Sequence, residues 1–132
     1  MYKLLPILLL VGCGSGVHID SQLQPLVNDY LEHCGGNLDS LISIKLSPLK
    51  SEVAGVCTTY GQDRTVTINS NLLSMFQGDD YRTMVKAVLY HELSHCLIGA
   101  DHVEGGLMSV YAHSPQEYRN NWQAWITELG CK

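Results

Sequence analysis

Apolar side chains recur every three to four positions in three parts of the chain, and each recurrence predicts a helix. The first covers residues 23–31, and Cys34-Gly35-Gly36 ends it. The second covers residues 81–98 and is apolar at its start but polar toward its end, where Gly99 stops it. The third follows Ser114-Pro115-Gln116-Glu117, a capping box with proline at the first helical position.

A different pattern, the alternation of apolar and polar residues, predicts strands between the first two helices. Residues 41–46 alternate, which would place Ile42, Ile44 and Leu46 together on one face. Residues 53–60 and 64–69 are two further strand candidates, and a turn that contains glycine separates them. The order of helix, strands, long helix, loop and helix predicts a small α+β domain.

Composition and charge favour a folded, non-nucleic-acid-binding protein. The chain has 132 residues, of which 45% are hydrophobic and 16% are charged, and one folded domain accounts for such a length and composition. The formal net charge is −5, and lysine and arginine do not cluster anywhere. Since phosphate backbones require a basic patch, we expect no nucleic-acid partner.

The N-terminus has the features of an export signal. Lys3 precedes an apolar run over residues 4–11, which is too short to span a bilayer. Leu10-Val11-Gly12-Cys13 then resembles the lipobox of bacterial lipoproteins. The resemblance implies cleavage before Cys13 and attachment of lipid to that cysteine. An ordinary signal peptide, with Cys13 in a disulfide, is the alternative.

These features predict three segments along the chain. Residues 1–12 would be a lipoprotein signal peptide, residues 13–21 a lipidated cysteine with a short tether, and residues 22–132 the folded domain. Gly14 follows the cysteine, and no acidic retention signal is present. We therefore expect an exported protein that is anchored in the bacterial cell envelope through Cys13, on the outer membrane in a Gram-negative host.

Four further cysteines predict a disulfide framework. Cys34, Cys57, Cys96 and Cys131 form an even set in an exported domain, which is typical of two disulfides. Three pairings are open, and we favour Cys57–Cys96 together with Cys34–Cys131. A zinc site made of cysteines is the competing interpretation, but the wide spacing without a C-x-x-C motif disfavours it.

The end of the long helix carries the most specific chemistry. In His91-Glu92-Leu93-Ser94-His95 the two histidines are four positions apart, so both imidazoles can reach one metal ion. Glu92 lies beside them, where its carboxylate can hold a metal-bound water. Ordinary surface histidines are the alternative, but they do not explain the Gly99-x-x-His102 step that follows.

This segment resembles the metzincin metallopeptidases, whose motif is H-E-x-x-H-x-x-G-x-x-H followed by a Met-turn. The chain has three residues instead of two between His95 and Gly99, a longer spacing that small bacterial and phage lipoproteins also show. The resemblance implies a Zn²⁺ ion bound by His91, His95 and His102. Three protein ligands leave one position for water, and Glu92 would be the general base.

The third metal ligand has two candidates. Asp101 lies ten residues after His91, which is the metzincin offset, while His102 lies eleven residues after it. We favour His102, because it keeps the spacing from the glycine that ends the helix. Asp101 would then orient a ligand through a hydrogen bond. Glu104 and His113 are more distant candidates.

Three further features follow from the resemblance, which covers roughly residues 53–129. Met108, after two glycines, would be the methionine of the Met-turn, although a plain core residue would suit the same geometry. Tyr111 would stabilise an oxyanion. The strand that contains residues 65–68 would be an edge strand that binds an extended substrate by strand addition.

These observations together predict a small metzincin-like zinc metallopeptidase. The fold would combine an N-terminal helix, about three strands, a long active-site helix, a Met-turn-like loop and a C-terminal helix. Its partner would be a peptide or protein substrate, and we expect a monomer. The alternative is an envelope lipoprotein that binds metal without catalysis, which the intact Glu92 disfavours.

Overall fold

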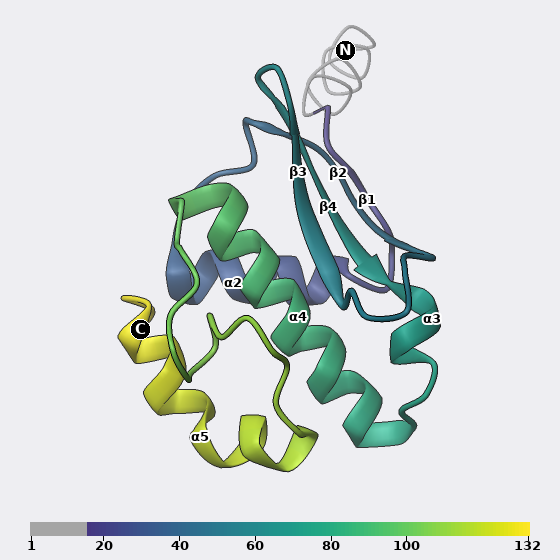
Figure 1. Cartoon of the computed structure of the whole chain (residues 1–132). Helices are drawn as coiled ribbons and strands as arrows, with labels where there is room; N and C mark the ends of the chain where they lie inside the picture. Colours follow the sequence, from purple (N-terminus) through teal and green to yellow (C-terminus); the bar gives the residue numbers. More distant parts are fainter. Residues whose placement is uncertain (1–15) are drawn as a thin grey trace, which may run out of the picture.

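A mixed four-stranded sheet and the helices packed on it form an α+β domain, as the sequence predicts (Figure 1). The computed structural model describes residues 16–132, apart from the side chain of Leu72. The predicted signal peptide and Cys13 lie outside the described residues. The elements in chain order are β1 (His18–Ile19), α2 (Gln24–Cys34), β2 (Leu41–Ser47), β3 (Gly55–Tyr60), β4 (Asp63–Asn69), α3 (Ser70–Leu73), α4 (Gly78–Ile98) and α5 (Pro115–Glu128).

The strand order is β1-β2-β4-β3, in which β1, β2 and β4 run parallel and β3 runs antiparallel to β4. The prediction that residues 65–68 form an edge strand is therefore wrong. They belong to β4, which is paired on both sides, and residues 66–69 are all buried. The edge position belongs to β3 instead.

The prediction for the apolar face of β2 is also wrong at one residue. Ile42 is 49% exposed, whereas Leu41 and Ile44 are buried. The register between β2 and β4 shifts between Leu41 and Ser43. An irregularity of this kind breaks the two-residue period, so the residues on either side of it no longer follow one alternation.

The sheet begins earlier in the chain than the sequence predicts. Within the predicted tether, His18 and Ile19 form β1 and pair with Ser43 and Ile44 of β2. The Asp20 carboxylate accepts a hydrogen bond from the backbone N–H of Leu46. The folded domain thus starts before residue 22.

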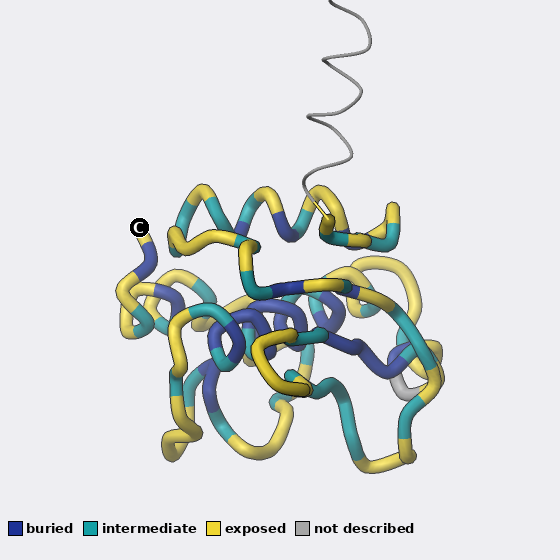
Figure 2. The backbone as a smooth tube through the Cα atoms, turned by 90° about the horizontal axis from the view of Figure 1, so that it is seen from above, coloured by how far each residue is buried: buried dark blue, intermediate teal, exposed yellow. Residues whose placement is uncertain are grey.

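Helix α4 is the central element of the domain. It packs against β3 and β4 and also contacts α2 and α5, and in Figure 1 it crosses the middle of the molecule. Ten of its 21 residues are buried, and the buried residues of the chain gather in the middle of the fold (Figure 2). Gly99 ends the helix in the left-handed conformation, with φ 64°, as predicted.

Both predicted disulfides are present. Cys34–Cys131 ties the end of α2 to the end of the chain, and Cys57–Cys96 ties β3 to α4. Two disulfides in a domain of this size indicate an oxidising, exported environment. No helix among residues 16–132 is long and apolar enough to cross a membrane.

The capping box of α5 is formed as predicted. The Ser114 hydroxyl accepts a hydrogen bond from the Glu117 N–H, and the Glu117 carboxylate accepts one from the Ser114 N–H. The helix places Tyr118, Trp122 and Trp125 against the core. It therefore closes the domain on the side of the loop that follows α4.

Candidate metal centre

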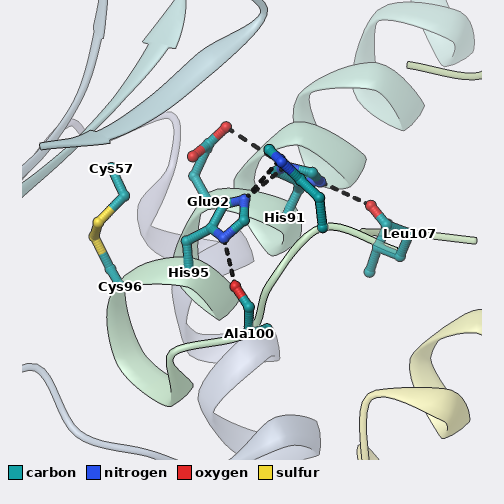
Figure 3. A network of polar contacts seen from close by, with 8 residues as sticks. Cys57, His91, Glu92, His95, Cys96, Ala100 and Leu107 are labelled. Carbon is teal, nitrogen blue, oxygen red and sulfur yellow. Dashed lines mark hydrogen bonds and ion pairs between the residues drawn. A yellow bond between two sulfur atoms is a disulfide. The ribbon is translucent and has the colours of Figure 1, made fainter. Parts of the chain in front are cut away.

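Three histidines converge at the C-terminal end of α4. His91 and His95 lie on one face of the helix, and His102 comes from the loop after Gly99 (Figure 3). Their Nε2 atoms are 3.0 Å apart for His91 and His95, 3.1 Å for His95 and His102, and 3.2 Å for His91 and His102. The predicted histidine triad is thus assembled in space.

Hydrogen bonds to the backbone fix the orientation of two of these rings. The Nδ1 of His91 donates to the Leu107 carbonyl oxygen at 2.8 Å, and the Nδ1 of His95 donates to the Ala100 carbonyl oxygen at 2.6 Å. Since a carbonyl only accepts, both Nδ1 atoms carry a proton, and in the neutral form of each ring the Nε2 atom then presents a lone pair. Lone pairs that face each other at 3.0 Å repel unless a cation lies between them. The donor set therefore fits a metal ion.

Burial keeps the His91 ring in the form that binds metal. Removal from water lowers the pKa of His91 to about 4, an effect that the neighbouring His95 and His102 reinforce and the Leu107 hydrogen bond partly offsets. The imidazole is consequently neutral near pH 7. A neutral imidazole is the ligand that transition metals require.

Glu92 lies beside the histidines, as the sequence predicts. The residue is only 6% exposed, and its carboxylate oxygen is 3.9 Å from the Nε2 of His91 (Figure 3). Because His91 is neutral, this contact is not an ion pair. Burial raises the pKa of Glu92 to about 7, against the effect of a hydrogen bond from the backbone N–H of Cys57. A carboxyl group with a pKa near neutrality can both accept and donate a proton.

A pocket of about 510 Å³ opens over the three histidines and Glu92. Its size is in the range of sites that hold small-molecule or peptide ligands. Three parts of the chain form its walls. They are β3 together with the residues just before it, helix α4, and the segment that follows the Met-turn-like loop. The residues that line it are Glu52, Val53, Ala54, Gly55, Val56, Cys57, Val88, His91, Glu92, His95, His102, Ser109, Val110, Ala112 and Tyr118.

Between the two candidates for the third ligand, the geometry selects His102. Its Nε2 joins those of His91 and His95, whereas Asp101 is exposed and does not belong to the cluster. Asp101 lines a separate pocket of about 300 Å³ together with Val103 and Trp125. Among residues 16–132, no hydrogen bond joins Asp101 to the histidines, so it does not orient them. Glu104 is exposed and outside the pocket.

The loop predicted as a Met-turn is a closed turn. Gly105 and Gly106 have φ angles of 75° and 68°, which favour glycine, and the Val103 N–H donates to the Met108 carbonyl oxygen. Met108 is buried, but it lines the second pocket instead of the one at the histidines. The residue of this turn that touches the site is Leu107, through its carbonyl.

The structure does not bring Tyr111, which was predicted to stabilise an oxyanion, to the pocket. Its side chain is 82% exposed, and Tyr111 does not line the pocket. Tyr118, the first apolar residue of α5, lines the pocket and is buried. Its hydroxyl accepts a hydrogen bond from the backbone N–H of His113. His113 itself holds the turn, since its Nε2 donates to the Gly106 carbonyl oxygen at 3.0 Å.

Sequence reasoning missed the contributions of the backbone. The carbonyls of Ala100 and Leu107 and the N–H of Cys57 carry no signature in their side chains.

Comparisons of the chain with models of known protein families, with curated proteins and with solved structures find no match.

Proposed function

We propose that the protein is a zinc-dependent endopeptidase of metzincin-like design. The observation that carries the proposal is the approach of three Nε2 atoms to within 3.0–3.2 Å of each other, beside a buried carboxylate in an open pocket. Imidazole nitrogens bind zinc at about 2.0–2.1 Å, which puts tetrahedral ligands roughly 3.3 Å apart. Three ligands also leave one position for water, which is the mark of a catalytic zinc site.

The metal, when bound, would supply a Lewis acid and lower the pKa of water toward neutrality. Glu92 would take one proton from that water as the water oxygen attacks the peptide carbonyl carbon. The same carboxyl group would then give the proton to the leaving amine nitrogen as the C–N bond breaks. A pKa of about 7 suits both steps, because the group changes its protonation state easily near neutral pH.

The position of β3 supports an extended peptide as the substrate. Among residues 16–132 no strand pairs with its outer edge, and β3 forms one wall of the pocket. The N–H and C=O groups of this edge, apart from the Cys57 N–H that faces Glu92, can add a peptide as a further strand. The strand-addition role that the sequence assigned to residues 65–68 thus moves to β3.

The site of action would be the bacterial cell envelope. The two disulfides favour an oxidising compartment. Lipidation of Cys13 would hold the domain near the membrane by a short segment, because β1 begins only five residues later. A monomer would suffice for the reaction, since the cluster and its pocket come from one chain.

The test uses the soluble domain that starts after Cys13. Zinc content and cleavage of a mixed peptide library are measured for the wild type and for Glu92→Gln, with Glu104→Gln as the matched control outside the pocket. We expect about one zinc per chain in all three proteins. Loss of general-base catalysis should lower the cleavage rate of Glu92→Gln by roughly 10²–10⁴-fold, while Glu104→Gln retains activity.

Two results would contradict the proposal. A folded wild type that binds no zinc would remove the metal site itself. Bound zinc without cleavage of any peptide would instead favour the non-catalytic alternative, an envelope protein that uses the metal for structure or interaction.

A further inference from the structure

The backbone of β3 lies close against α4 at Gly55. A Cβ atom at this position would lie 2.7 Å from Cγ1 of Val88 and 2.9 Å from Cγ of Glu92. Atoms at these distances overlap, so only a residue without a side chain lets β3 contact the helix here. The contact includes the side chain of Glu92 itself.

Cys57, two residues further along β3, directs its N–H away from the sheet. The Ala54 carbonyl oxygen accepts a hydrogen bond from the Asn69 N–H, which sets the phase of the antiparallel ladder. Since the paired groups alternate along an antiparallel strand, the N–H of Cys57 does not face β4. It donates to the Glu92 carboxylate instead.

The disulfide fastens the same residue to the same helix. Cys57 is bonded to Cys96, which lies one helical turn after Glu92 on the same stripe of α4. Cys57 therefore holds α4 twice, by a hydrogen bond from its N–H to Glu92 and by a covalent bond from its sulfur to Cys96. The disulfide fixes the distance between Cys57 and α4, across which the hydrogen bond to Glu92 forms.

We propose that Gly55, Cys57 and the Cys57–Cys96 disulfide form a clamp that positions the Glu92 carboxylate for proton transfer. The proposal rests on the proposed function, in which Glu92 is the general base. None of the three residues touches the reacting atoms, so they are positioning residues. Their effect is on the rate of the chemical step and not on metal binding, because the metal-binding histidines are oriented by Ala100 and Leu107.

Reduction of this disulfide would release the clamp. A dithiol would supply two electrons and two protons, the S–S bond would break into two thiols, and the reductant would close into its own cyclic disulfide. The strand would then keep its pairing with β4, but its N–H would no longer be held opposite Glu92. The activity would thus depend on an oxidising environment through the site as well as through stability.

The second disulfide offers a matched control for the test. Cys34–Cys131 joins residues that are 97 positions apart in the sequence, against 39 for Cys57–Cys96. Neither Cys34 nor Cys131 lines the pocket. Removal of this disulfide should destabilise the fold at least as much. The paired variants Cys57→Ser/Cys96→Ser and Cys34→Ser/Cys131→Ser are compared in the full chain, at a temperature at which both remain folded.

We expect Cys57→Ser/Cys96→Ser to lower kcat by about 10- to 100-fold, the range seen when groups that orient catalytic residues are lost. KM and zinc affinity should change by less than about threefold, because the pocket and the histidines remain. The Cys34→Ser/Cys131→Ser variant should keep its kcat within about twofold. Gly55→Ala, with both disulfides intact, should lower kcat in the same way.

A second readout does not need activity. Hydrogen exchange of the residue 57 amide should be slow in the wild type and at least about tenfold faster in both Glu92→Gln and Cys57→Ser/Cys96→Ser. An unchanged kcat in Cys57→Ser/Cys96→Ser, or equal losses in the two disulfide variants, would overturn the clamp while leaving the peptidase proposal intact. If the wild type cleaves no peptide, the peptidase proposal fails, and equal exchange of the amide in all proteins would overturn the clamp as well.

Discussion

The two sides of α4 carry polar residues in very different arrangements. Toward α2, the Tyr30 hydroxyl lies 3.1 Å from the hydroxyl of Ser94, and the Tyr90 hydroxyl donates to the Asp29 carboxylate. Both tyrosines are fully buried, and each polar group has a partner of complementary kind. Such pairs stabilise a unique packing and have no capacity left for a ligand.

Toward the pocket, the polar groups do not satisfy each other. His91 and His95 present lone pairs to one another, and Glu92 is buried at a pKa of about 7. Binding of a cation or a proton by these side chains would lower the free energy of the site. The difference between the two sides indicates that buried polar residues mark a functional site when like atoms, here the Nε2 atoms of the histidines, face one another, and not merely because they are buried.

The largest expected effect concerns the third ligand on the pocket side. His102→Ala should lower zinc affinity by at least about 100-fold, since the loss of a direct ligand exceeds that of an orienting group. Asp101→Ala should change it by less than about threefold, because Asp101 lies outside the cluster. Competition with a zinc chelator measures both affinities. A larger loss in Asp101→Ala would show that the aspartate is the ligand.

A second effect appears in the pH dependence of stability of the metal-free protein. The pKa of Glu92 is raised in the folded state from 4.5 to about 7, so between these values the folded protein holds a proton that the unfolded chain has lost. The free energy of unfolding that comes from Glu92 therefore falls as the pH rises through this window. His91, with its pKa lowered from 6.5 to about 4, contributes the opposite slope between about pH 4 and 6.5.

Glu92→Gln removes only the first of these slopes. As the pH rises from 4.5 to 7, the free energy of unfolding of the metal-free variant should increase relative to that of the wild type. The increase should reach about 3 kcal/mol, at roughly 1.4 kcal/mol per pH unit. Urea unfolding at several pH values in the presence of a chelator measures the difference. A difference that does not vary with pH would show that Glu92 is not held in a perturbed environment.

The smallest effect concerns the opposite side of α4. Tyr30→Phe and Ser94→Ala should each cost about 1–3 kcal/mol, because each leaves one buried hydroxyl without its partner. The double variant should cost less than the sum of the two. Urea unfolding measures these values, and zinc affinity is the control, which should stay unchanged. A loss of zinc affinity would mean that the two sides of the helix are coupled.

Much of the fold and the cluster could be predicted from the sequence, because the relevant signals are local. The helical spacing of apolar residues, the capping box at Ser114 and the glycine at position 99 each act within a few residues. The spacing of His91 and His95 on a helix fixes their shared face. The even number of cysteines predicted two disulfides, whereas their pairing was a preference among three possibilities that the structure confirms.

The errors arose where distant parts of the chain decide the outcome. Ile42 turns outward because the register with β4 shifts at that point, and β4 is internal because β2 pairs with it from the other side. Tyr118 reaches the pocket through the placement of α5, which no local pattern encodes. The backbone groups that orient His91, His95 and Glu92 leave no trace in the side-chain sequence.

The central claim is that His91, His95 and His102 hold one metal ion and leave a position open toward the pocket. X-ray absorption spectroscopy at the zinc edge of the loaded protein tests this claim most directly. We expect three imidazole nitrogens and one further oxygen, all at about 2.0–2.1 Å. A spectrum with fewer than three imidazoles, or with a sulfur ligand at about 2.3 Å, would contradict it.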